Sequence, residues 1–97
     1  MKAVYIIYNQ SLTEEVQEIL DKLSIRGYTQ WTGITGRGSV KGDPHKGTHT
    51  WPELNNAHLT IIEDTQIDAL LNKLKSFNKG VEEQGLRAFV WDIVDTV

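Results

Sequence analysis

Apolar residues follow two different periods along this chain, and the alternation of these periods predicts its fold. Residues 2–9 (KAVYIIYN) are rich in β-branched and aromatic side chains, which predicts a strand with two apolar faces. Further strands are predicted at 28–35, 56–63 and 86–94, and the last of them (LRAFVWDIV) is again apolar on both faces. Between the strands, apolar residues recur every three or four positions in two segments, which indicates two amphipathic helices.

Capping signals predict where the two helices begin and end. Ser11 and Glu14 have the spacing of a capping box, so the first helix is expected to begin there. Gly27 is its expected C-terminal cap, because glycine readily adopts the left-handed conformation that commonly ends a helix. Asp64 is the expected N-cap of the second helix, and Gly80 is the residue expected to end it.

The order of these elements is strand, helix, strand, loop, strand, helix, strand. Two halves of this kind, each with a right-handed crossover, give an α+β ferredoxin-like βαββαβ architecture, a four-stranded antiparallel sheet with two helices on one face. The 97 residues then form a single domain. Because two helices cover one face, the apolar residues of the other face would be exposed in a monomer. We therefore expect the open face to pack against other copies of this chain.

A long glycine-rich loop, roughly residues 36–55, separates the second and third predicted strands. Loops of this length inside a compact domain are usually functional. The run from Gly33 to Gly42 allows backbone N–H groups to approach an anion, and Arg37 and Lys41 would add charge-assisted hydrogen bonds to a phosphate. The run matches neither the dinucleotide fingerprint nor a P-loop. A hairpin loop that needs glycine for its turns is the alternative.

Histidines raise the separate hypothesis of a metal site. His45 and His49 lie four residues apart in the loop, and His58 lies on the third predicted strand. Four-residue spacing suits a helix, but Pro44 and Gly47 argue against a helix here. The alternative is that His45 and His49 are two solvated loop residues.

Composition narrows the function classes. The chain is 39% hydrophobic and 24% charged, as globular proteins are. A net charge of −3 argues against a nucleic-acid partner, and no run approaches the 18 apolar residues of a membrane span. The absence of cysteine and of a signal peptide before the first strand fits a cytoplasmic location. No nucleophile and base stand in a recognisable arrangement, so we expect a non-enzymatic protein.

The chain resembles the PII-like signal-transduction proteins, a branch of the nitrogen regulatory protein PII superfamily. Several short motifs carry the resemblance: the opening strand from Met1 to Val4, Gly27-Tyr28-Thr29 after the first helix, Gly36-Arg37-Gly38 at the start of the loop, and the final run from Arg87 to Val94. The segment from Trp51 to Asn55 looks like divergent members found beside transporters. The resemblance covers nearly the whole chain, and the long glycine-rich loop fits it better than CutA, a related trimer.

The resemblance implies a homotrimer that binds a small effector, commonly an adenine nucleotide, in the clefts between its subunits. The loop 36–55 then corresponds to the T-loop, which signals the ligand state to a membrane transporter or a metabolic enzyme. The ligand-binding residues that the resemblance implies are Thr29, Gly36, Arg37, Gly38 and Arg87.

The chain also departs from the family pattern. Its connection before the last strand contains Glu82 and Glu83, where the family has a glycine-rich loop that holds phosphate, and its loop 36–55 lacks the family's modifiable tyrosine. The ligand of such a divergent member is an adenine nucleotide, another anion or a metal, or the site is lost. A metal-binding or metal-tolerance trimer of the CutA type, with His45 and His49 as ligands, is the alternative function.

Overall fold

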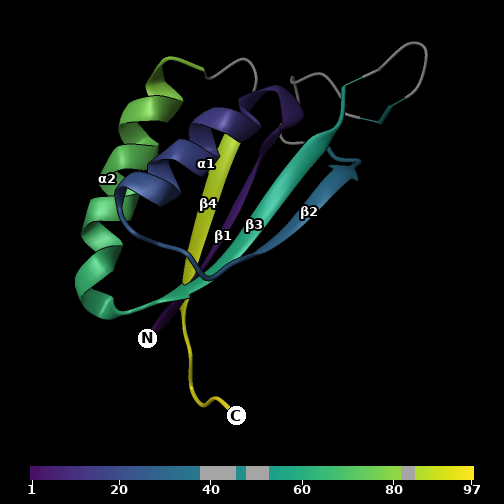
Figure 1. The fold of residues 1–97 in the computed structure, drawn as a ribbon. Helices are drawn as coiled ribbons and strands as arrows, with labels where there is room; N and C mark the ends of the chain where they lie inside the picture. Colours follow the sequence, from purple (N-terminus) through teal and green to yellow (C-terminus); the bar gives the residue numbers. More distant parts are fainter. Residues whose placement is uncertain (38–45, 48–52, 82–84) are drawn as a thin grey trace.

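The computed structural model of this chain describes residues 1–37, 46–47, 53–81 and 85–97. Its elements follow one another as β1 (Lys2–Asn9), a 3-10 turn η1 (Gln10–Leu12), α1 (Thr13–Lys22), β2 (Thr29–Ile34), β3 (Asn55–Ile62), α2 (Asp64–Lys79) and β4 (Leu86–Asp92). Figure 1 shows a single sheet with both helices on the same side of it. The predicted ferredoxin-like βαββαβ fold is therefore confirmed.

The strands lie in the order β2-β3-β1-β4, and each neighbouring pair is antiparallel. β1 is therefore an interior strand, while β2 and β4 form the two edges of the sheet. The register sets Asn9 and Ile34 each opposite Asn55, and Tyr8 opposite Leu86. The ends of β1 and β2 and the beginnings of β3 and β4 thus meet at one end of the sheet, at the top of Figure 1. We call this the loop end.

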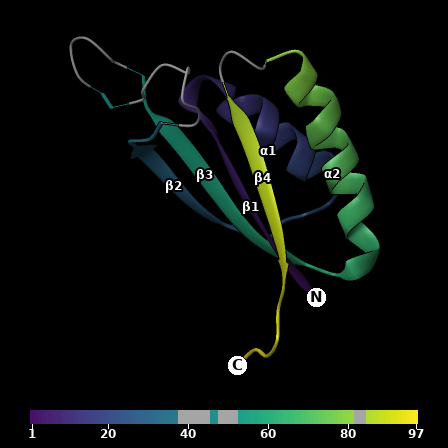
Figure 2. The ribbon, with the colours of Figure 1, turned by 180° about the vertical axis from the view of Figure 1, so that it is seen from behind.

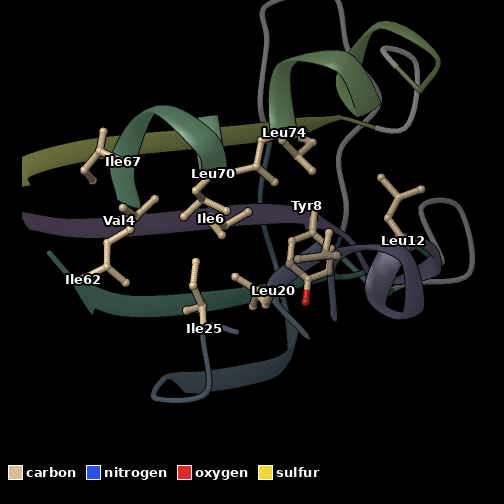
Figure 3. Close-up of a cluster of buried hydrophobic side chains, with 12 residues drawn as sticks. Val4, Ile6, Tyr8, Leu12, Leu20, Ile25, Ile62, Ile67, Leu70 and Leu74 are labelled. Atoms are coloured by element: carbon tan, nitrogen blue, oxygen red, sulfur yellow. The ribbon is translucent and has the colours of Figure 1, made fainter. Parts of the chain in front are cut away.

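The hydrophobic core lies between the sheet and the two helices. Val4, Ile6 and Tyr8 alternate along β1 and are buried on the helix-covered face. They pack with apolar residues of the two helices, which Figure 3 shows in close-up, among them Leu20 from α1 and Ile67, Leu70 and Leu74 from α2. Each fully buried side chain of this size contributes roughly 1.5–3 kcal/mol through the apolar surface removed from water.

The start of α1 differs from the predicted capping box. Asn9, rather than Ser11, is the capping residue, and its side-chain oxygen accepts a hydrogen bond of 2.9 Å from the backbone N–H of Ser11. The chain then makes the 3-10 turn η1 before α1 begins at Thr13. The prediction placed the cap two residues too late because the asparagine looked like the last residue of the strand, and it has both roles.

The end of α1 also differs from the prediction, which placed the cap at Gly27. Ser24 adopts the left-handed conformation, with φ 58°. Its backbone N–H donates to Asp21, and the N–H of Ile25 donates to Leu20 at 2.9 Å. These two bonds form a Schellman motif, and the buried Ile25 supplies the apolar contact that often accompanies it. The prediction was wrong because serine rarely takes a position that normally favours glycine.

The second helix follows its prediction more closely. Glu63, rather than Asp64, is the N-cap of α2, and it forms a reciprocal capping box with Gln66. Gly80 ends the helix as expected. β4 ends at Asp92, two residues earlier than the apolar pattern predicted.

The second face of the sheet carries exposed apolar side chains. Trp31, Ile61, Phe89 and Trp91 are each between 42% and 54% exposed, and they come from β2, β3 and β4. The rings of Tyr5 and Trp31 lie 6.3 Å apart on this face. Figure 2, which views the protein from behind, again shows both helices on the opposite side of the sheet. The expected open apolar face is therefore present in the chain.

Candidate functional site

The structure describes four of the five residues that the family resemblance implied, and Gly38 lies outside the described residues. Thr29 begins β2 and is exposed, opposite Leu59 of β3. Gly36 and Arg37 follow β2 at the loop end. Arg87 is the second residue of β4 and is also exposed.

The two predicted basic residues lie at opposite flanks of the sheet. Arg37 follows β2 and Arg87 lies on β4, and these are the two edge strands of the order β2-β3-β1-β4. Neighbouring strands are about 4.8 Å apart, so three such spacings set the two edges about 14 Å apart. Figure 1 shows the same separation, with β3 and β1 between the edges. One chain therefore does not bring the two arginines together at one site.

Gly36 has a steric role at the base of the loop. A Cβ atom at this position would lie 2.6 Å from Nδ2 of Asn55, which is closer than side chains approach one another. Glycine therefore lets the chain after β2 lie against the start of β3. This close approach fixes where Arg37, the next residue, leaves the sheet.

Buried Asn56 is a site residue that sequence reasoning did not identify. Its side-chain oxygen accepts a hydrogen bond of 2.8 Å from the backbone N–H of Gly33, and its amide donates to Oγ1 of Thr13 at 2.8 Å. These bonds tie the irregular end of β2, where the pairing register shifts between Trp31 and Ile34, to the start of α1. A polar residue at an inward position of an otherwise apolar strand was the signal that could have identified it.

His58 does not lie in the loop region with the other two histidines. It is fully buried under α1, and its Nδ1 atom lies 2.8 Å from the hydroxyl of Tyr8. Burial lowers the pKa of His58 and raises the pKa of the Tyr8 hydroxyl. Within the described ranges no group of three or more His, Asp or Glu side chains is placed to hold a metal ion. His45 and His49 lie outside these ranges.

The whole chain, residues 1–97, matches the family model of the nitrogen regulatory protein P-II. The protein therefore belongs to the P-II family, whose members are regulatory proteins that bind ligands and are generally not enzymes. Among curated protein sequences none matches this chain. The helices of the part that the structure describes are all too short or too polar to cross a membrane.

Several solved structures share this fold. One is CPII, a nitrogen regulatory PII-like protein from Thiomonas intermedia K12 bound to ADP, AMP and bicarbonate, which is 22% identical at a TM-score of 0.73 over 95% of this chain and 88% of that chain. CPII bound to ADP and bicarbonate gives 23% identity and a TM-score of 0.76 over 95% and 84%. A PII-like signaling protein from Thermus thermophilus gives 22% and 0.65 over 93% and 83%. At these identities the likeness shows the fold.

Proposed function

We propose that this protein is a homotrimeric, non-enzymatic PII-like regulator that binds a small anionic effector in the clefts between its subunits. Ligand state is passed to a membrane transporter or a metabolic enzyme through the loop 36–55, and the protein acts in the cytoplasm. The observation that supports this proposal is the position of Arg37 and Arg87 beside opposite edges of one sheet. When the β2 flank of one subunit meets the β4 flank of the next, these two arginines come to line one cleft.

The open face of the sheet supports assembly from several copies. Its exposed aromatic residues Trp31, Phe89 and Trp91 belong to both edge strands, so the apolar surface extends across the sheet. Contiguous apolar surface of this kind marks an interaction site in soluble proteins. Packing this face against two further copies buries it and sets the flanks of neighbouring sheets side by side.

An adenine nucleotide, with bicarbonate as a second ligand, is the effector class that we propose. Guanidinium groups bind phosphate and carboxylate-like anions through paired, charge-assisted hydrogen bonds, which suits Arg37 and Arg87. The structurally similar CPII was solved with ADP, AMP and bicarbonate. The exposed hydroxyl of Thr29 is a further hydrogen-bonding group at the β2 flank.

Calorimetric titration of the purified protein tests this function. We expect ADP to bind, with and without bicarbonate, and Arg37→Ala and Arg87→Ala each to weaken binding by about tenfold or more, the loss of one charge-assisted contact. Arg26→Ala is the matched control, because Arg26 is exposed and lies between α1 and β2, away from both flanking positions. Wild-type protein that binds none of ATP, ADP, AMP and bicarbonate would rule out this effector class.

A further inference from the structure

Three segments of the chain are joined at Asn9, the last residue of β1. Its backbone N–H donates to the carbonyl of Gly85 at 3.2 Å, and its side-chain oxygen accepts from the N–H of Ser11 at 2.9 Å. Its side-chain amide donates to Oε2 of Glu53 at 2.7 Å. Asn9 is 2% exposed, so these bonds form away from bulk water, where they hold geometry firmly.

The chain that returns from the loop is held at the same point by its backbone. The N–H of Gln10 donates to the carbonyl of Leu54 at 2.9 Å, and the N–H of Gly47 donates to the carbonyl of Glu53 at 3.2 Å. Gly47 has φ +67°, and a Cβ atom there would lie 2.8 Å from Cδ2 of Leu54, so this approach requires glycine. We call residues 46–47 and 53–54 the returning arm. Glu53 is fixed in it through both backbone and side chain.

The other partner of Asn9 leads directly to a proposed effector residue. Gly85 is the residue before β4, and Arg87 is the second residue of that strand. A displacement of Gly85 therefore moves the backbone that carries Arg87, and Asn9 holds Gly85 and Glu53 through two different groups of one residue.

We propose that the hydrogen bond between Asn9 and Glu53 is a positioning contact that couples the returning arm to the start of β4. Effector binding beside Arg87 shifts the start of β4, and the contact passes this shift to the arm. The inference rests on the proposed function. Asn9 and Glu53 act through the segments that they hold, and their role is separate from that of the arginines.

The contact can be tested by exchanging its donor and acceptor. Asn9→Asp keeps the oxygen that caps Ser11 but sets a second carboxylate against Glu53. Adding Glu53→Gln restores a hydrogen bond of opposite polarity, with the introduced amide donating to the introduced carboxylate. Glu53→Gln alone is the matched control, because its side-chain oxygen still accepts from Asn9 while the charge is lost.

Amide hydrogen exchange in effector-free protein gives the first measurement. We expect Asn9→Asp to accelerate exchange of the Gln10 and Gly47 amides by about tenfold. Glu53→Gln and the double variant should exchange close to the wild-type rate. Wild-type rates in Asn9→Asp, or a double variant as fast as Asn9→Asp, would overturn the proposal, because the contact would then not hold the arm.

The same amides, measured with ADP added, test the coupling. We expect ADP to change their exchange in the wild type and in the double variant, and to leave it unchanged in Asn9→Asp. Wild-type protein that binds ADP without any change at Gln10 and Gly47 overturns the coupling and leaves the proposed function standing. Wild-type protein that does not bind ADP overturns the proposed nucleotide effector and the coupling together.

Discussion

The hydroxyl of Tyr8 lies 2.8 Å from Nδ1 of His58, and both side chains are buried beneath α1. On the other side of the ring, Nε2 lies 3.3 Å from Oε1 of Gln17, whose own amide donates to Asp21. Gln17 therefore presents an acceptor, so Nε2 carries the proton and Nδ1 accepts from Tyr8. The neutral imidazole satisfies each partner, whereas a second proton would set a donor against the donating hydroxyl of Tyr8.

Stability is expected to fall when the pH is lowered from 7.5 to 5.5. Burial holds the pKa of His58 below its ordinary value of about 6.5, so the unfolded chain takes up a proton first. The contribution of neutral His58 is complete above this value, and is lost as the pH falls through 6.5 toward the pKa of the folded state. Urea unfolding at the two pH values measures this loss.

Two histidine variants make the pH experiment specific. His58→Gln is expected to reduce the difference in unfolding free energy between pH 7.5 and pH 5.5, because it removes the group that titrates. His49→Gln, the control, should keep the wild-type difference. An unchanged difference in His58→Gln would assign the pH dependence to other groups.

Ser24→Gly is expected to stabilise the protein by about 1 kcal/mol. Ser24 has φ 58°, a left-handed conformation that costs a residue with a Cβ atom about 1 kcal/mol or more and costs glycine little. Thermal and urea unfolding measure the gain. Gly27→Ala is the comparison, since its Cβ meets no atom within 4 Å and Gly27 does not have a positive φ. A loss of stability in Ser24→Gly would contradict the assigned helix end.

Trp91→Lys and Phe89→Lys are expected to shift the protein from trimer to monomer. Both side chains are about half exposed on the open face of β4, and a charge buried there by assembly would be costly. Light scattering coupled to size-exclusion chromatography measures the mass. Asp68→Lys on the exposed surface of α2 should remain trimeric. A monomeric wild type at micromolar concentration would contradict the proposed assembly.

Mixed trimers are expected to restore effector binding between two inactive variants. Arg37→Ala and Arg87→Ala each remove one flank of every cleft. After the two variants are unfolded and refolded together in equal amounts, random assembly leaves about a quarter of the clefts with both arginines intact. Calorimetry should therefore recover about a quarter of the wild-type binding sites. No recovery in a confirmed mixed trimer would place both arginines in the cleft of a single chain.

Strong periodic patterns made the fold predictable, and single-residue geometry limited the rest. The apolar run of β1 and the stripe of Ile67, Leu70 and Leu74 identify their elements because many side chains repeat the same signal. Ser24 gave no such signal, since a left-handed serine is specified by its tertiary contacts. The bond from Asn9 to Glu53 joins residues 44 positions apart, and no local pattern predicts it.

The candidate site was predictable in its residue types but not in its arrangement. Arg37 and Arg87 could be selected from their motifs. Their separation across the sheet depends on the order β2-β3-β1-β4, which follows from how the two crossovers pack. Asn56 was overlooked because its importance comes from its contacts with Gly33 and Thr13, which lie on other elements.

The interior position of β1 has a consequence for how the protein forms. Its two neighbours, β3 and β4, are synthesised long after it, and Lys2 pairs with both Ile62 and Asp92. The central pairings thus close large loops, which slows folding because chain entropy is lost before the contacts form. During synthesis β1 must wait with its apolar faces unpaired, so this small protein spends its most aggregation-prone period on the ribosome.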